Sequence, residues 1–192
     1  MIYLASSSPR RAELLRQIGV KFDILRLDID ESAGKTESAE QLVLRLSREK
    51  AIQGRELLTS MKSDDLVLAA DTLINLQGQI LGKPASINQC CTMLRQLSGQ
   101  THQVLTALAL INQQGRLTQS CSVNEIRFRN LDEQEIQLYC QSDEPLDKAG
   151  AYAIQGKAAI FIEHLSGSYS AVMGLPLFET AQLLAQAEYY NN

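Results

Sequence analysis

The sequence has little of the residue types that most often build metal and redox sites. Its 192 residues include no tryptophan, two histidines and four cysteines. The cysteines form no Cys-x-x-Cys pair and lack metal-finger spacing, so we expect reduced, mostly buried thiols. The histidines form no His-x-x-x-His pair, which excludes that zinc motif. A Ser–His–Asp triad on His102 stays open, but no Gly-x-Ser-x-Gly elbow supports it, and a structural hydrogen bond is the simpler role.

Glycine-rich phosphate loops are also missing. The pattern Gly-x-x-x-x-Gly-Lys-Ser/Thr is absent, which excludes a P-loop NTPase. The absence of Gly-x-Gly-x-x-Gly weakens the case for a dinucleotide-binding protein.

Long apolar runs and an excess of positive charge are absent too. The longest apolar runs, such as residues 104–111, fall far short of the about 18 residues of a membrane-spanning helix. The N-terminal run reaches Pro9 and two arginines too early to form a signal-peptide core. Basic residues number 18 and acidic residues 22, which leaves no excess of basic charge for a nucleic-acid surface. We therefore expect a cytoplasmic protein that binds neither membranes nor nucleic acid.

The composition is that of an ordinary globular protein, with 45% hydrophobic residues and no repeat or linker, and we expect residues 1–192 to form a single domain. Apolar runs predict strands at residues 2–5, 20–25, 66–70, 104–111, 117–128 and 161–163, with a hairpin at 73–81. Capping residues and apolar periodicity predict helices after Ser8, after a Ser38–Gln41 capping box, at 86–97, after an Asp132–Glu135 box and from about Pro176. The alternation predicts an α/β protein with a mixed sheet and a cleft at its strand ends.

The segment 6–11, Ser-Ser-Ser-Pro-Arg-Arg, lies where the first strand is expected to turn into the first helix. Its third serine suits the N-cap and the proline the first helical position. Free backbone N–H groups and the positive end of the helix dipole would meet there. A polyphosphate site would be completed by the hydroxyls of Ser6, Ser7 and Ser8 and the guanidinium groups of Arg10 and Arg11. A plain helix start with two solvated arginines is the alternative.

Asp71 follows the apolar strand predicted at residues 66–70. Ligands of α/β folds bind beyond the carboxyl ends of strands, so Asp71 would face the cleft and hold a divalent cation or take a proton from water. An aspartate that caps a turn is the alternative. The nearby acidic loop with Asp28, Asp30 and Glu31 supplies further oxygen ligands for Mg²⁺ or Mn²⁺, although such a loop is also typical of a solvated turn.

Three lysines lie in positions that suit phosphate binding. Lys50 is expected on a helix with its stem packed, whereas Lys83 and Lys148 lie in loops next to glycine or alanine. A triphosphate must be neutralised before water can attack it, so the three together favour phosphate-ester chemistry, although each alone is typical of a surface lysine. Tyr152 and Tyr169 would stack on a base or pack in the core.

Several motifs stand in a fixed order along almost the whole chain. They are residues 5–11 (Ala-Ser-Ser-Ser-Pro-Arg-Arg), 30–31 (Asp-Glu), 45–46 (Arg-Leu), 50–51 (Lys-Ala), 70–72 (Ala-Asp-Thr), 80–84 (Ile-Leu-Gly-Lys-Pro), 98–104 (Ser-Gly-Gln-Thr-His-Gln-Val), 144–156 (Glu-Pro-Leu-Asp-Lys-Ala-Gly-Ala-Tyr-Ala-Ile-Gln-Gly), 167–169 (Gly-Ser-Tyr) and 174–177 (Gly-Leu-Pro-Leu). In this order they resemble the Maf family of nucleotide pyrophosphatases, once described as septum formation inhibitors. The long segment 144–156, in register with the Ser-Pro-Arg-Arg start, makes the resemblance specific.

The resemblance implies a fold like that of inosine triphosphate pyrophosphatase: a mixed twisted sheet with flanking helices and two lobes around a deep cleft, in a homodimer. It implies hydrolysis of a nucleoside triphosphate to the monophosphate and pyrophosphate, by metal-assisted attack of water on the α-phosphate. Asp71 would accept the proton, and Glu31 and Asp71 would hold Mg²⁺ or Mn²⁺. The phosphates would be held by Ser6, Ser8, Arg10, Arg11, Lys50, Lys83 and Lys148.

Arg10, Thr72 and Gln155 match the pattern of family members that act on dTTP and UTP. The type that acts on 7-methyl-GTP has Trp, Gln and Glu at these three positions. A glutamine amide offers a donor and an acceptor to the O4/N3 edge of uracil or thymine, whereas a carboxylate only accepts. We therefore expect a dTTP/UTP pyrophosphatase with a role in nucleotide-pool sanitation and cell-division arrest. The alternatives are a pyrophosphatase for 7-methyl-GTP or another modified nucleotide, and a non-catalytic nucleotide-binding regulator of septum formation.

Overall fold

The computed structural model describes residues 1–34, 36–58, 60–62, 64–187 and 189. The strands are β1 (Ile2–Ala5), β2 (Phe22–Leu25), β3 (Leu66–Leu76), β4 (Gln79–Leu81), β5 (Thr101–Asn112), β6 (Leu117–Phe128) and β7 (Ile162–Ser166). The α-helices are α1 (Pro9–Gln17), α2 (Ala39–Glu56), α3 (Ile87–Leu97), α4 (Glu133–Cys140), α5 (Tyr169–Val172) and α6 (Leu177–Gln186), and short 3-10 helices occupy Ala149–Ala151 and Lys157–Phe161.

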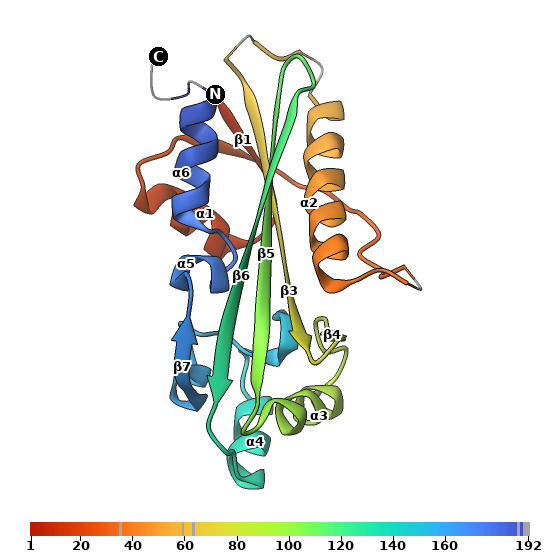
Figure 1. Cartoon of the computed structure of the whole chain (residues 1–192), viewed down its shortest axis with the longest axis vertical. Coiled ribbons are helices and arrows are strands. Elements are labelled where there is room, and N and C mark those ends of the chain that lie inside the picture. The colour runs from red at the N-terminus through yellow and green to blue at the C-terminus, as the bar shows by residue number, and fades with distance from the viewer. Residues whose placement is uncertain (35, 59, 63, 188, 190–192) are drawn as a thin grey trace.

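The sheet is mixed, in the order β2-β1-β3-β5-β6-β7, with β4 beside β3. β1 runs parallel to β2 and β3, and the remaining pairs are antiparallel. The long strands twist about one another, with α2 on one side, α1 and α6 on the other, and α3, α4 and β7 toward the far end (Figure 1). This arrangement confirms the predicted α/β fold with a mixed sheet and flanking helices. None of the helices in the described ranges has the length and apolarity that a bilayer crossing needs.

Local sequence signals account for most helix starts. Ser38 and Gln41 form both bonds of the predicted capping box, at 3.2 and 2.9 Å, and the box that begins at Asp132 is also complete. Ser8 occupies the N-cap of α1, but its side chain makes no capping bond. The hydroxyl of Ser6 instead accepts the Ser8 N–H at 3.2 Å. The turn into α1 is therefore tied by Ser6.

β3 does not end before Asp71, and the prediction that this residue lies beyond a strand end is wrong. The strand continues to Leu76, because β5 pairs with it along almost its whole length. The other edge of β3 differs, since β1 pairs with it only as far as Ala69 and β4 joins it only at Ile74. Residues 70–73 thus have an open edge between two paired stretches.

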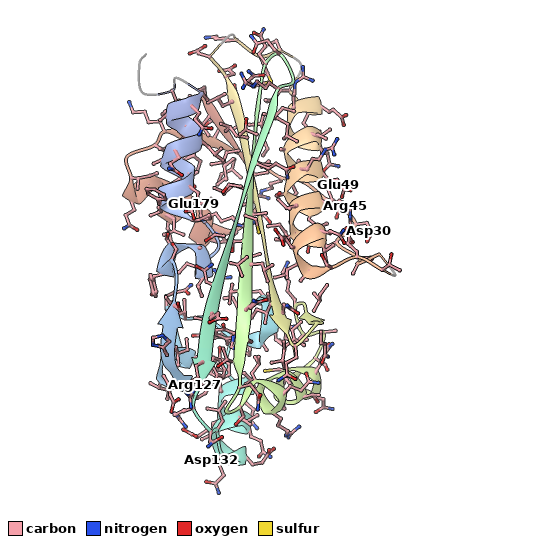
Figure 2. All side chains as sticks on the ribbon, in the orientation of Figure 1. Asp30, Arg45, Glu49, Arg127, Asp132 and Glu179 are labelled. Atoms are coloured by element: carbon pink, nitrogen blue, oxygen red, sulfur yellow. The ribbon has the colours of Figure 1, made fainter. Side chains whose placement is uncertain are left out.

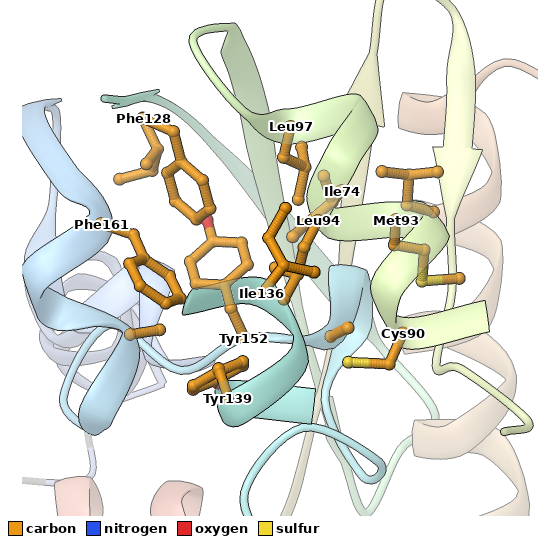
Figure 3. Close-up of a cluster of buried hydrophobic side chains, with 14 of the residues drawn as sticks. Ile74, Cys90, Met93, Leu94, Leu97, Phe128, Ile136, Tyr139, Tyr152 and Phe161 are labelled. Carbon is orange, nitrogen blue, oxygen red and sulfur yellow. The ribbon is translucent and has the colours of Figure 1, made fainter. Parts of the chain in front are cut away.

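Buried apolar side chains form clusters on both sides of this open stretch. Toward one end, Leu94, Phe128 and Ile136 belong to a cluster that packs α3 and α4 against the strands (Figure 3). Toward the other end, separate clusters join α1, α6 and α2 to the first strands. The interruption is therefore in the pairing of the β3 edge, since Ala70 and Leu73 themselves pack in two of these clusters. The cysteines are free and three of the four are buried, as predicted.

Candidate active site

A cavity of about 640 Å³ lies at the open stretch of β3. Its walls come from the turn into α1, the loop after β2, α2, β3, the loop after β4 and the segments 147–155 and 172–174. Every residue to which the resemblance gave a role lines it: Ser6, Ser8, Arg10, Arg11, Glu31, Lys50, Asp71, Thr72, Lys83, Lys148 and Gln155. The structure therefore brings the predicted site residues together in one cavity.

Lys50 lies between two carboxylates. Successive strand residues point to opposite faces, so Asp71 faces α2, where Lys50 follows buried Leu46 by one helical turn. Lys50 Nζ is 2.6 Å from Asp71 Oδ1 and 2.7 Å from Glu31 Oε1. The side chains of Lys50 and Asp71 are only 11% and 9% exposed, so solvent screens their attraction less than that of a surface pair.

Glu31 carries its negative charge in a basic environment. Partial burial alone would raise the pKa of Glu31, but the hydrogen bond and charge of Lys50, followed by the charges of Lys83 and Arg11, lower this pKa below its ordinary value. Lys83 Nζ lies 3.8 Å from Glu31 Oε2. The carboxylate therefore remains ionised well below neutral pH.

The loop that carries Glu31 is held by Arg45 in the N-terminal half of α2. Arg45 donates to the carbonyl of Ser32 at 2.9 Å and binds both carboxylate oxygens of Glu37, at 2.7 and 2.9 Å. Asp30 accepts the Ser32 N–H at 2.9 Å and lies beside Arg45 in Figure 2. Asp30 thus shapes the loop. It does not line the cavity in the described structure, so its position does not support the role of metal ligand considered for it from the sequence.

Arg11 is held by three groups from distant parts of the chain. Its Nε donates to the carbonyl of Gly174 at 2.8 Å, Nη1 to the hydroxyl of Ser6 at 3.1 Å, and Nη2 to that of Thr72 at 3.2 Å. Burial lowers the pKa of Arg11, although the charge of Asp71 opposes this. Three of its five N–H groups are engaged in these bonds. Arg11 therefore organises the cavity wall as well as contributing charge to it.

The segment 147–156 forms another wall of the cavity. Lys148 pairs with Asp147, a cavity residue that the sequence analysis did not assign. Gly150 and Ala151 both have positive φ, 65° and 63°, and only glycine adopts such a backbone without strain. The Gly150 N–H donates to the carbonyl of Gly82 at 2.9 Å. This bond joins the loops that carry Lys148 and Lys83.

The carboxylate of Glu144 fixes the end of this segment. It accepts from the hydroxyl of Tyr139 at 2.8 Å and from the N–H of Lys157 at 2.8 Å. A Cβ at Gly156 would lie 2.2 Å from Glu144 Oε2, so the backbone passes the carboxylate at a distance that only glycine permits. Gln155, the preceding residue, is thereby held with its side chain exposed to the cavity. Arg10 also lines the cavity; burial lowers the pKa of its guanidinium, against the charges of Asp147 and Glu144.

His102 and Tyr152 belong to the core. His102 is 2% exposed, its Nε2 lies 2.7 Å from the Tyr152 hydroxyl, and its ring packs edge-on against Phe128. Burial lowers the pKa of His102 to about 4, and Nδ1 is buried without a partner. The structural interpretation of His102 is confirmed. Tyr152 touches the cavity from this core, whereas Tyr169 is not among the residues that line it in the described structure.

The acidic residues fit a cation that a substrate helps to bind. Mg²⁺ is commonly held by one or two carboxylates together with substrate phosphates. Glu31 and Asp71 converge on the same Lys50 nitrogen, so their oxygens lie close enough for such a site. Within the described ranges no group of three or more histidine, cysteine, aspartate or glutamate side chains is placed to hold a metal alone. The residues therefore fit a cation shared with a phosphate and not an all-protein cage.

Sequence reasoning missed the groups that support these residues. Glu144 and Asp147 both lie inside the quoted segment 144–156, so a signal for them existed. Thr106 carried no such signal in the sequence, because it stands within a run of apolar residues on β5. In the structure Thr106 is fully buried, and its hydroxyl lies 3.0 Å from that of Thr72.

Two carboxylates, several cations and a helix N-terminus around one cavity suit a polyphosphate that is to be cleaved by water. Fold and cavity together define an α/β protein with a cleft whose charged groups suit a polyphosphate. The chain belongs to the Maf-like protein family, whose family model matches residues 1–187.

Relatives about half identical to this chain carry the name dTTP/UTP pyrophosphatase. The protein from Nitrosospira multiformis is 53% identical over 97% of this chain and 94% of its own length. That from Aromatoleum aromaticum is 51% identical over 98% of this chain and 96% of its own. Among solved structures, a HAM1 protein from Coxiella burnetii aligns with 96% of this chain and 98% of its own, with a TM-score of 0.51 and 18% identity. That similarity shows a shared fold.

Proposed function

We propose that this chain hydrolyses dTTP and UTP to the nucleoside monophosphate and pyrophosphate. The observation that carries the proposal is the Lys50 ammonium between Glu31 and Asp71 in a cavity otherwise rich in cations. The names of relatives about half identical over nearly the full length support the choice of nucleotide. We further expect a homodimer that acts in the cytoplasm, in nucleotide-pool sanitation and division arrest.

Asp71 is the proposed proton acceptor. Lys50 occupies one of its oxygens, so the base becomes free when the substrate phosphates draw the ammonium toward themselves. Asp71 then takes a proton from water as the water oxygen attacks the α-phosphorus, and the bond from that phosphorus to the pyrophosphate oxygen breaks. Arg11, Lys83 and Lys148 balance the charge that builds up on the leaving group.

Glu31 and Asp71 would hold Mg²⁺ or Mn²⁺ together with the phosphates. The cation would supply positive charge to the phosphoryl oxygens and lower the pKa of a bound water. Arg10, Thr72 and Gln155 are the proposed nucleobase contacts. The Gln155 amide can donate an N–H to the O4 acceptor of uracil or thymine.

Pyrophosphate release from dTTP, UTP, CTP, ATP, GTP and 7-methyl-GTP, each with Mg²⁺ and with Mn²⁺, tests this proposal. The proteins are the wild type, Asp71→Asn and, as a matched control, Asp23→Asn at an exposed position on β2. We expect release from dTTP and UTP, a loss of kcat of about 100-fold or more in Asp71→Asn with a smaller change in KM, and wild-type rates in the control.

The other outcomes identify the alternatives. Release chiefly from 7-methyl-GTP would keep the reaction and overturn the roles given to Arg10, Thr72 and Gln155. Nucleotide binding without release from any of the six would support the non-catalytic regulator. A near-normal rate in Asp71→Asn would show that another group accepts the proton.

A further inference from the structure

Three hydroxyl and carbonyl groups form a chain of hydrogen bonds behind the cavity. Thr106, fully buried on β5, has its Oγ1 2.7 Å from the carbonyl oxygen of Ala171 and 3.0 Å from Thr72 Oγ1. A carbonyl oxygen only accepts, so the single proton of the Thr106 hydroxyl is directed to Ala171. The hydroxyl of Thr106 must then accept from Thr72.

The hydrogen bonds of Thr72 are limited in the same way. Its one proton is directed to Thr106, and one of its two lone pairs receives Nη2–H of Arg11 at 3.2 Å. One lone pair remains. Because Thr72 lines the cavity, it meets a ligand there as a hydrogen-bond acceptor and not as a donor.

Both ends of this chain of bonds are anchored to the same short segment. Arg11 donates to the carbonyl of Gly174 at 2.8 Å, and Thr106 donates to that of Ala171, three residues earlier. If the hydroxyls reversed, the bond to Ala171 would be lost with nothing gained inside the protein. The direction from Thr72 through Thr106 to Ala171 is therefore the preferred one, by about the net worth of one hydrogen bond.

We infer that Thr106 is a positioning residue that sets the direction of the Thr72 hydroxyl and so makes the cavity select a nucleobase that presents an N–H donor. This inference rests on the proposed function, in which Thr72 contacts the base. Uracil and thymine carry a donor at N3, whereas cytosine carries an acceptor there. A Thr72 hydroxyl locked as an acceptor thus favours UTP over CTP, by about fivefold for one hydrogen bond of about 1 kcal/mol.

The test compares kcat/KM for UTP and CTP in the wild type, Thr106→Val and Thr106→Ser. Valine matches threonine in shape but cannot accept the Thr72 proton, so Thr72 becomes free to donate to N3 of cytosine. We expect the ratio of UTP to CTP to fall about fivefold in Thr106→Val and to return in Thr106→Ser. The control is Thr101→Val, an exposed threonine on the same strand, for which the ratio is expected to stay unchanged.

The ratio of kcat/KM for UTP to that for CTP distinguishes a positioning role of Thr106 from a purely structural one. If Thr106→Val lowered both values of kcat/KM equally, the inference would be overturned, because damage to the fold does not distinguish N3–H from N3. Should Thr106→Val fail to fold, Thr72→Val removes the acceptor itself, and an unchanged ratio in that variant overturns the inference as well.

Failure of the proposed function would be visible separately. If the wild type released pyrophosphate from neither nucleotide, calorimetric binding of UMP and CMP to the same variants would take the place of the kinetic ratio. A fivefold shift in relative affinity in Thr106→Val, restored in Thr106→Ser, would support the inference, and an unchanged ratio would overturn it.

Discussion

Buried His102 makes the stability of the protein depend on pH in a defined window. The ordinary pKa of a histidine is 6.5, and burial of the ring lowers that of His102 to about 4 in the folded chain. Between these two values the unfolded chain binds a proton that the folded chain does not. The stabilisation from keeping His102 neutral is therefore complete above about pH 6.5 and is lost as the pH falls toward 4.

The size of the effect follows from the pKa difference. One pKa unit corresponds to about 1.4 kcal/mol, so the loss grows to about 3 kcal/mol by pH 4, and about 2 kcal/mol of it falls between pH 7 and pH 5. The carboxylates of Glu37, Glu133 and Glu135 also titrate differently in the folded chain, with pKa values lowered to about 2 by hydrogen bonds to arginine. The stabilisation from these glutamates is present above about pH 4.5 and is lost below it. It therefore changes little between pH 7 and pH 5, where the effect of His102 is measured.

Urea unfolding at pH 7 and pH 5 measures the effect. We expect the free energy of unfolding of the wild type to fall by about 2 kcal/mol, and that of His102→Gln, which can still bond to Tyr152 but cannot titrate, to change far less. A His164→Gln variant, changed at an exposed position on β7, should keep the wild-type loss. If the free energy of unfolding fell equally in the wild type and in His102→Gln, His102 would not be the cause of the pH dependence.

Two further predictions concern the cavity. Lys50→Met removes the ammonium beside Asp71, and we expect kcat for pyrophosphate release to fall about 100-fold while the far-UV spectrum stays unchanged; a rate within threefold of the wild type would contradict this. Gly156→Ala forces a Cβ against the Glu144 carboxylate, and because that group is held by hydrogen bonds, unfolding should become easier by about 1–3 kcal/mol. Gly82→Ala, where a Cβ meets nothing within 4 Å, is the control in the same urea titration.

Elements with a local chemical signal could be predicted from the sequence. The capping box at Ser38 and the strand at residues 117–128 were placed correctly, because neighbouring residues determine them. The site residues were recognisable from motifs, although their roles stay predictions. Asp71 was misplaced, since a polar pair after an apolar run is typical of a strand end.

What continues the strand past Asp71 is pairing with β5, about thirty residues away in sequence, which no local pattern reveals. The same applies to the support of Arg11, whose partners include Gly174, 163 residues away. Thr106 could not be recognised either, because a single hydroxyl in an apolar strand looks like a neutral replacement for valine.

The open stretch of β3 also limits how this architecture can change in length. From Ala69, the last residue paired with β1, to Ile74, the first paired with β4, the strand rises about 17 Å. An insertion of one residue before Asp71 would turn its carboxylate to the opposite face of the sheet, away from Lys50, whereas an insertion of two would preserve the facing and widen the opening by about 7 Å. Between Ala69 and Asp71, chains of this architecture can therefore change in length only by even numbers of residues if they are to keep the carboxylate and the ammonium together.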